Sequence, residues 1–380
     1  MEYRKRDVLR LAKRLNNTKR AYLLVNPLQG KHIPVRPSAA LDMMNCLGEK
    51  LRRRFPDARL VIGFAETATA IGAAAASCFP DECVYIHTTR ENLTPDTEWV
   101  CFQEEHSHAT DQKLCANSLR EWISATPQVI LIDDELSTGK TIRNMIAQMR
   151  RMFPEMRGKP VVAASVINRL SGENEAALLA EGVACEYLAH IPNEDYTLEV
   201  QRWRTESPAD HRRTSALPEA ARVQAATLGS ADPRAGVSVG QYRQACADAI
   251  DSVMPRIRDR LGPDKRVLVL GTEEFMYLPL RLACEIERAG LANAVFFHAT
   301  TRSPIEISRL PDYPLFNGYR ITSFYEEGRD TYIYDLAGYD TAIVLSDSPA
   351  YPPAAVCDLA SALRENGCND VIFLTGGGYV

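Results

Sequence analysis

Short apolar runs alternate with amphipathic stretches along most of the chain. The clearest run covers residues 128–132, and apolar side chains recur at helical spacing after it, at Ile142, Met145, Ile146 and Met149. Comparable runs occupy residues 21–26, 60–63, 84–87 and 159–167. An alternation of strands and helices of this kind predicts a parallel, doubly wound α/β sheet.

The apolar pattern dissolves over residues 195–240 and resumes after them. We interpret this stretch as a connector or insert between an α/β domain over residues 1–194 and a second α/β domain over residues 241–380. The expected elements of the second domain are strands at 266–270, 294–298, 341–345 and 370–374 and helices at 241–261, 275–289 and 354–365.

Three other stretches have their own character. Val8, Leu11, Ala12 and Leu15 recur at helical spacing and predict an amphipathic helix within the first 20 residues. Residues 88–110 and a tyrosine-rich stretch after residue 298 are expected to be irregular, and the first is long enough to suggest a functional loop.

The two halves repeat one order of parts. A run ending at Gly63 precedes a helix and then residues 84–90, and a run ending at Gly271 precedes a helix and then residues 295–302. We interpret the second domain as a diverged copy of the first, and the alternative is the chance similarity of any two α/β halves. Unrelated strand orders in the two domains would contradict the duplication.

Composition excludes several classes of protein. The 380 residues are 46% hydrophobic and 24% charged, with a net charge of −5, so no general attraction to nucleic acid or to an anionic membrane is expected. No apolar run approaches the roughly 20 residues that span a bilayer. Ten cysteines without a C-x-x-C pair fit reduced thiols in a cytoplasmic protein.

The candidate chemistry lies directly after the run at 128–132. Asp133 and Asp134 stand where open α/β sheets place their ligands, and Ser137, Thr138 and Gly139 then open a helix whose N-terminal N–H groups can bind an anion. An ordinary N-capped helix is the alternative. A P-loop is excluded because its first glycine would fall on Asp134, whose charge repels phosphate.

These residues resemble the D-D-x-x-[ST]-[TA]-G-x-[ST]-x-R loop of type I phosphoribosyltransferases, in the form found in orotate phosphoribosyltransferases, and the match extends through Arg143. The resemblance covers residues 20–190 and implies the family fold, a parallel doubly wound sheet with a hood. It implies phosphoribosyl pyrophosphate (PRPP) as the donor, with Asp133 and Asp134 on the ribose hydroxyls. The donor-binding segment it implies comprises Asp133, Asp134, Glu135, Leu136, Ser137, Thr138, Gly139, Lys140 and Thr141.

Other sites follow from the same resemblance. The turn Glu66, Thr67, Ala68 and Thr69 is similar to the family's pyrophosphate loop. Lys31 and His32 lie in a Gly-basic-x-x-Pro stretch similar to the start of the hood, which implies the acceptor side, against the alternative of a surface turn. Mg²⁺ is the implied cofactor, held by substrate oxygens and water with no direct protein ligand.

The closing loop departs from the family pattern. No lysine occurs between Lys50 and Lys113, so Arg90 is the candidate cation on the pyrophosphate side. His106 and His108 are further catalytic candidates, which could contact diphosphate, accept a proton or bind metal. A solvated surface is the alternative for this pair.

Thr301-Arg302-Ser303-Pro304 matches the signature of the TRSP domain. The whole chain is similar to two-domain phosphoribosyltransferase–TRSP proteins associated with tellurium-resistance gene clusters. This implies a biosynthetic enzyme that transfers phosphoribosyl to a small nitrogenous acceptor. A non-catalytic sensor of PRPP or nucleotides is the competing hypothesis, and a homodimer is a candidate oligomer.

Overall fold

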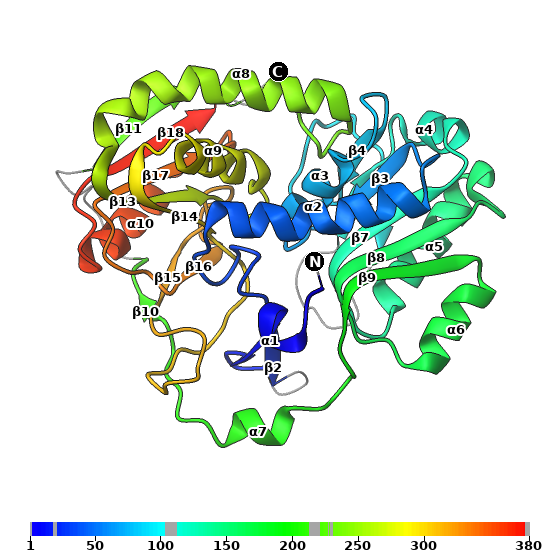
Figure 1. Ribbon diagram of the computed structural model, residues 1–380, viewed down its shortest axis with the longest axis horizontal. Coiled ribbons are helices and arrows are strands. Elements are labelled where there is room, and N and C mark those ends of the chain that lie inside the picture. Colours follow the sequence, from blue (N-terminus) through cyan, green and yellow to red (C-terminus); the bar gives the residue numbers. More distant parts are fainter. Residues whose placement is uncertain are drawn as a thin grey trace. The chain divides into compact units, whose positions relative to one another are not determined.

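The computed structural model describes residues 2–17, 21–102, 112–212, 221–226, 228 and 231–376 (Figure 1). The chain forms two compact units, and neither is one continuous segment. Unit 1 comprises Met1–Lys5, Asp42–Glu194 and Ala231–Ala245. Unit 2 comprises Arg6–Leu41, Asp195–Ser230 and Cys246–Val380.

Unit 1 is built on a six-stranded sheet in the order β12-β4-β3-β7-β8-β9. All pairings are parallel except that of the edge strand β12 with β4. The strands are β3 (Leu60–Gly63), β4 (Val84–His87), β7 (Val129–Leu136), β8 (Val161–Asn168), β9 (Val183–His190) and β12 (Val237–Ser238). A separate antiparallel pair is formed by β5 (Trp99–Phe102) and β6 (Gln112–Cys115).

Helices cover both faces of this sheet. The helical elements are α2 (Pro37–Arg54), α3 (Thr69–Ala76), α4 (Leu119–Ala125), α5 (Lys140–Met152), η1 (Pro154–Met156) and α6 (Gly172–Ala180). Alternate strand residues such as Leu60, Ile62 and Leu131 join the apolar stripe of α5 in one core. The opposite face meets α3, whose alanine-rich sequence is buried throughout and lets the helix approach the strands closely.

Unit 2 has a five-stranded, all-parallel sheet in the order β11-β18-β17-β13-β14. Its strands are β11 (Ala221–Ala226), β13 (Gly262–Gly271), β14 (Ala292–Ala299), β17 (Thr341–Ser346) and β18 (Val371–Gly376). The helical elements of the second half are α8 (Val239–Ile257), η2 (Arg258–Arg260), α9 (Tyr277–Arg288) and α10 (Pro353–Glu365). The α/β class expected from the sequence is confirmed for both halves.

The smaller elements belong almost entirely to unit 2. A three-stranded sheet contains β10 (Ala209–Asp210), β15 (Gly318–Thr322) and β16 (Asp330–Tyr334). An antiparallel pair joins β1 (Arg10–Lys13) and β2 (Tyr22–Val25). Two short helices are α1 (Lys5–Val8) and α7 (Thr197–Gln201). No helix in the described ranges is both long and apolar enough to cross a membrane.

The two sheets share one strand order. Reading from the edge, β4-β3-β7-β8 in unit 1 is matched by β14-β13-β17-β18 in unit 2. In unit 1 the antiparallel pair β5–β6 follows β4 along the chain. In unit 2 the antiparallel pair β15–β16 follows β14. A fifth parallel strand follows in each sheet. It is β9 in unit 1 and β11 in unit 2, and β11 comes before the other strands of its sheet in the sequence. Related orders are what a duplication requires.

Four expectations about local structure are wrong, and one of them concerns residues 88–110, which contain β5 instead of being irregular throughout. The N-terminal amphipathic helix is limited to α1, because residues 10–13 instead form an antiparallel pair with β2, in which Ala12 is the buried residue. Residues 195–240 contain α7, β10, β11 and β12, and the tyrosine-rich stretch contains β15 and β16. These strands are short or polar on one face. Pairing with strands distant in the sequence stabilises them, and the local sequence pattern does not predict them.

Gly72 provides a test of how tightly α3 packs on the sheet. A Cβ there would lie 2.9 Å from Tyr85 Cε2 and 3.1 Å from Gly63 Cα, and the Tyr85 hydroxyl is fixed by a 2.6 Å bond to Thr69 O. We expect Gly72→Ala to lower the free energy of unfolding by about 1–3 kcal/mol, because overpacking outweighs the helix propensity of alanine. Gly172→Ala, with no heavy atom within 4 Å, is the control and should not destabilise the protein. Urea denaturation measures both, and equal effects would contradict the packing argument.

Candidate functional site

The acidic residues of the motif lie on the last part of β7. Asp133 pairs with Ser165 of β8, and Leu136 pairs with Asn168, so the strand continues through the acidic pair rather than ending before it. Asp133, Asp134 and Glu135 are all half-buried. They stand at the carboxyl end of a central strand, between β3 and β8, which is where open parallel sheets bind ligands.

Asp134 is held by its neighbours. Thr67 Oγ1 donates a 2.8 Å hydrogen bond to Asp134 Oδ1, and the Asp134 N–H donates a 2.9 Å bond to Asp133 Oδ1. Burial raises the pKa of Asp134, the nearby Glu135 charge acts in the same direction, and the Thr67 hydrogen bond opposes them. The bond from Thr67 also joins the turn at residues 66–69 to the acidic end of β7.

Glu135 has a structural partner that sequence reasoning missed. The Arg169 Nη1 donates a 3.0 Å bond to Glu135 Oε1, and its Nη2 donates a 2.8 Å bond to the backbone oxygen of Glu194. The Arg169 side chain is only 1% exposed. The sequence feature that could have indicated Arg169 is its position as a charged residue directly after the apolar strand β8. The pair fixes the residue next to Asp134.

The loop after β7 has the geometry of an anion site. Gly139 has φ of 77°, and α5 begins at the next residue. A Cβ at Gly139 would lie 3.1 Å from Leu178 Cδ1 and 3.3 Å from Leu170 Cδ2, so both conformation and space favour glycine. Ser137 and Thr138 are half-buried beside it, and Lys140 is exposed at the helix start. The helix N-terminus, the hydroxyls and the lysine all favour an anion.

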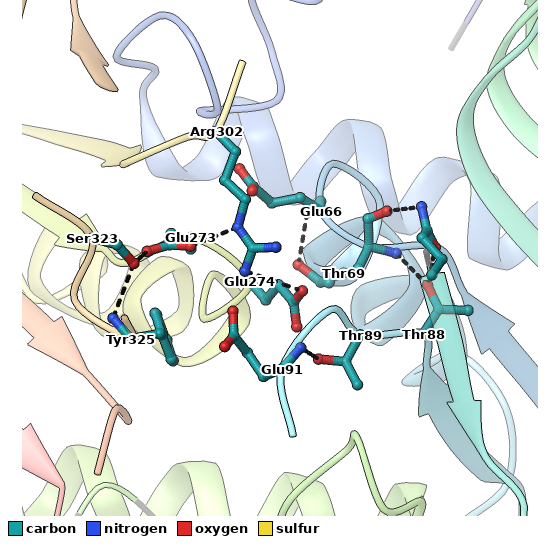
Figure 2. A network of polar contacts seen from close by, with 12 residues as sticks. Glu66, Thr69, Thr88, Thr89, Glu91, Glu273, Glu274, Arg302, Ser323 and Tyr325 are labelled. Carbon is teal, nitrogen blue, oxygen red and sulfur yellow. Dashed lines mark hydrogen bonds and ion pairs between the residues drawn. The ribbon is translucent and has the colours of Figure 1, made fainter. Parts of the chain in front are cut away.

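The turn after β3 is anchored to the loop after β4. Thr88 Oγ1 accepts a 2.8 Å bond from the Ala65 N–H and donates to Gln112 Oε1 at 2.5 Å, while Gln112 Nε2 donates to the Ala65 oxygen. Thr69 Oγ1 donates to the Glu66 oxygen at 3.3 Å, as Figure 2 shows. The peptide between Ala65 and Glu66 is cis. Glu66, Ala68 and Thr69 are buried, and Thr67 is half-buried.

Arg90 follows this anchored segment. The Thr89 N–H and oxygen pair with the backbone of Lys113 in β6, and the Glu91 N–H donates to Thr89 Oγ1 at 2.9 Å. Arg90 is half-buried between these residues in the sequence. Strand β4 lies beside β3 in the sheet, so Arg90 belongs to the same carboxyl edge as the turn at 66–69. Sequence reasoning did not single out Thr88 or Gln112, which fasten this edge.

Lys31, His32, His106 and His108 are the remaining candidates. Lys31 and His32 belong to unit 2 and are buried there. Lys31 Nζ donates to the backbone oxygens of Glu273 at 2.5 Å and Thr300 at 2.9 Å. His106 and His108 lie outside the described residues. No cluster of three or more His, Cys, Asp or Glu side chains suited to a metal ion occurs within the residues the structure describes.

Two protein-family models match separate parts of the chain. Residues 8–191 match the model of a family described as phosphoribosyl transferase. Residues 232–363 match the TRSP domain, described as lying C-terminal to that family. No curated protein matches the chain.

Among solved structures, the chain is similar to adenine phosphoribosyltransferases. That of Rhodothermus marinus is 16% identical, with 49% of this chain and 96% of that chain covered and a TM-score of 0.33. That of Trypanosoma brucei, in complex with AMP, pyrophosphate and ribose-5-phosphate, is 15% identical, with 48% and 76% covered and a TM-score of 0.35. The first part of the chain is thus similar to the phosphoribosyl transferase family, and the later part to the TRSP domain.

Proposed function

We propose that unit 1 transfers the 5-phosphoribosyl group of PRPP to a small nitrogenous acceptor and releases pyrophosphate. The observation that carries the proposal is the placement of Asp133 and Asp134 at the carboxyl end of β7, followed by the Gly139 turn that opens α5. Carboxylates there accept hydrogen bonds from two ribose hydroxyls. The turn and helix start hold the 5-phosphate of the same ligand.

The leaving group is assigned to the neighbouring strands. The turn from Glu66 to Thr69 opens α3, and Arg90 follows β4, so backbone N–H groups and a guanidinium serve the diphosphate. Negative charge grows on this group as the bond to ribose C1 breaks. Preorganised donors at this edge therefore stabilise the transition state more than the bound substrate.

The carboxylates of Asp133 and Asp134 are assigned to the ribose, so Mg²⁺ would be held by diphosphate and ribose oxygens and by water, with no direct protein ligand. When bound with the donor, Mg²⁺ supplies positive charge that neutralises the diphosphate. Burial raises the pKa of Asp134, so hydrogen bonds to its carboxylate, from Thr67 and from a ribose hydroxyl, favour the ionised form.

The acceptor side is less defined. Lys31 and His32 remain acceptor-side proposals through the resemblance to the hood, and His106 and His108 remain proposals for proton transfer. The orotate-like subtype and the association with tellurium resistance likewise stay predictions. A PRPP sensor without turnover is the competing function, and formation of pyrophosphate in the presence of host metabolites separates the two.

The acidic pair provides the first functional test. We expect Asp133→Asn combined with Asp134→Asn to weaken Mg²⁺–PRPP binding at least about 100-fold by calorimetry, since two charge-assisted hydrogen bonds are lost. The matched control, Asp57→Asn with Asp312→Asn, changes two exposed carboxylates and should bind as the wild type does. Unchanged affinity in the Asp133/Asp134 variant, with an unaltered thermal melt, would exclude the proposed site.

The Arg169–Glu135 pair tests how the acidic strand end is positioned. Arg169→Met leaves Glu135 without its buried partner, so we expect a loss of about 3–5 kcal/mol of stability and weaker PRPP binding in the fraction that folds. Arg143→Met is the matched control, because Arg143 pairs with Glu181 at the surface and should cost at most about 1 kcal/mol.

A double-mutant cycle with Glu135→Gln separates the two roles of this pair. If Glu135→Gln restores stability in the Arg169→Met background but PRPP affinity stays low, the pair positions the site. If affinity returns together with stability, Arg169 serves the fold alone.

A further inference from the structure

Unit 2 repeats the backbone hydrogen bonds that shape the candidate site of unit 1. The Thr88 N–H donates to the Gly63 oxygen at 2.9 Å, and the Thr300 N–H donates to the Gly271 oxygen at 3.1 Å. Gly63 and Gly271 are the last residues of β3 and β13, and the threonines follow β4 and β14. Each unit therefore connects the ends of its two corresponding strands in the same way.

The side-chain bonds at this edge are repeated as well. Thr88 Oγ1 accepts from the N–H two residues after Gly63, and Thr300 Oγ1 accepts from the N–H of Glu273, two residues after Gly271. Thr89 forms an antiparallel bridge with Lys113, and Thr301 forms one with Tyr332. The correspondence is thus residue by residue, which chance similarity of two α/β sheets does not explain.

The same register places functional side chains in pairs. Gly63 lies opposite Ile132 in β7, and Gly271 lies opposite Leu345 in β17, so Asp347 takes the position of Asp134. Counting from the paired threonines, Arg302 takes the position of Arg90. Unit 2 retains an acid and an arginine at its carboxyl edge, whereas Ser346 replaces the first acid, Asp133.

An ion cluster fixes the arginines of this edge. Glu273 is fully buried, and its Oε2 accepts from Arg302 Nε at 2.7 Å and from Arg329 Nη2 at 3.0 Å. Ser323 donates to Glu273 Oε1 at 2.5 Å, as drawn in Figure 2. The Arg302 side chain is 12% exposed and that of Arg329 20%, so both side chains still reach solvent in part.

The loop after β17 is closed to phosphate. Ser348 Oγ accepts from the N–H groups of Ala350 and Tyr351, and the Ser348 N–H donates to Ser346 Oγ. Positions 349, 352 and 353 are prolines, which have no N–H. The backbone donors that a phosphate would need are either occupied or missing before α10. A ligand at this edge therefore lacks a terminal phosphate bound in the manner of unit 1.

Hydroxyl and aromatic groups remain at the same edge. Tyr325 Oη donates to Asp347 Oδ1, and the Tyr351 ring contacts Phe324 edge-on, with 5.6 Å between ring centroids. The Tyr351 hydroxyl is buried and has no hydrogen-bond partner within the described part of the chain, which is costly for a polar group. Glu273 and Tyr351 both have positive φ, 47° and 38°, a rare conformation that concentrates at ligand sites.

We propose that the carboxyl edge of the unit 2 sheet binds an unphosphorylated nucleoside. The Asp347 carboxylate accepts hydrogen bonds from sugar hydroxyls, and the aromatic side chains Tyr325 and Tyr351 contact the heterocycle. The Tyr351 hydroxyl and the partly exposed side chains of Arg302 and Arg329 bond the polar atoms of the ligand. All residues of this proposed site belong to unit 2.

Calorimetry on the full chain tests this site. The Asp133→Asn/Asp134→Asn variant serves as background, so that donor binding does not contribute, and adenosine, guanosine, cytidine and uridine are titrated with their 5′-monophosphates. We expect one nucleoside per chain to bind, at least about tenfold more tightly than its monophosphate. Asp347→Asn should weaken binding about tenfold or more, and Tyr351→Phe about threefold to tenfold. Asp312→Asn, at an exposed acid, and Tyr339→Phe, at the opposite end of β17, are the matched controls.

Three results would overturn the proposal. These are no heat of binding from any of the four nucleosides, unchanged affinity in both Asp347→Asn and Tyr351→Phe, or a monophosphate that binds more tightly than its nucleoside. Tyr351→Phe removes one oxygen from a side chain that has no internal hydrogen bond, so it keeps the test valid if Asp347→Asn unfolds. Because the background lacks the donor acids, failure here leaves the function proposed for unit 1 unaffected.

Discussion

The parallel register of three neighbouring strands is the constraint on which the candidate site depends. Gly63 lies opposite both His87 and Ile132, so the segments after β3, β4 and β7 leave the sheet at one level. The Phe64 N–H continues the ladder by donating to the Ile132 oxygen at 2.9 Å. Loops that are 20 to 70 residues apart along the chain therefore meet at one edge, and a slip of one residue would turn Asp134 to the other face of the sheet.

Burying such an edge requires every polar group to have a partner. Thr88, Gln112 and the backbone of Ala65 satisfy one another in the interior of unit 1, and Arg169 does the same for Glu135. These bonds add little net stability one by one, but the loss of any one partner leaves a buried group unpaired. The ligand groups then meet a surface whose donors and acceptors are already oriented, which lowers the free-energy cost of binding.

Sequence predicted those parts of the molecule whose own pattern decides their structure. The run before Asp133 and the stripe of Ile142, Met145 and Met149 gave β7 and α5 because burial and period agree. Residues 10–13 were wrongly expected to be helical, since their pairing with β2 is a tertiary contact. The motif predicted the segment from Asp133 to Thr141. Arg169 and Thr88 instead act through partners that are distant in the sequence, and local residue spacing does not predict such partners.

The repeated frame separates what the fold fixes from what the ligand demands. Both units keep the threonine that caps the turn after the first strand, Thr88 or Thr300, because the frame needs its hydrogen bonds. The two units differ in the loops that we propose to contact a ligand. Gly139 opens the loop of unit 1, whereas Ser348 and its flanking prolines fill the corresponding loop of unit 2. Conservation of the frame with divergence of the loops is the outcome expected when one sheet edge is retained and its specificity is changed.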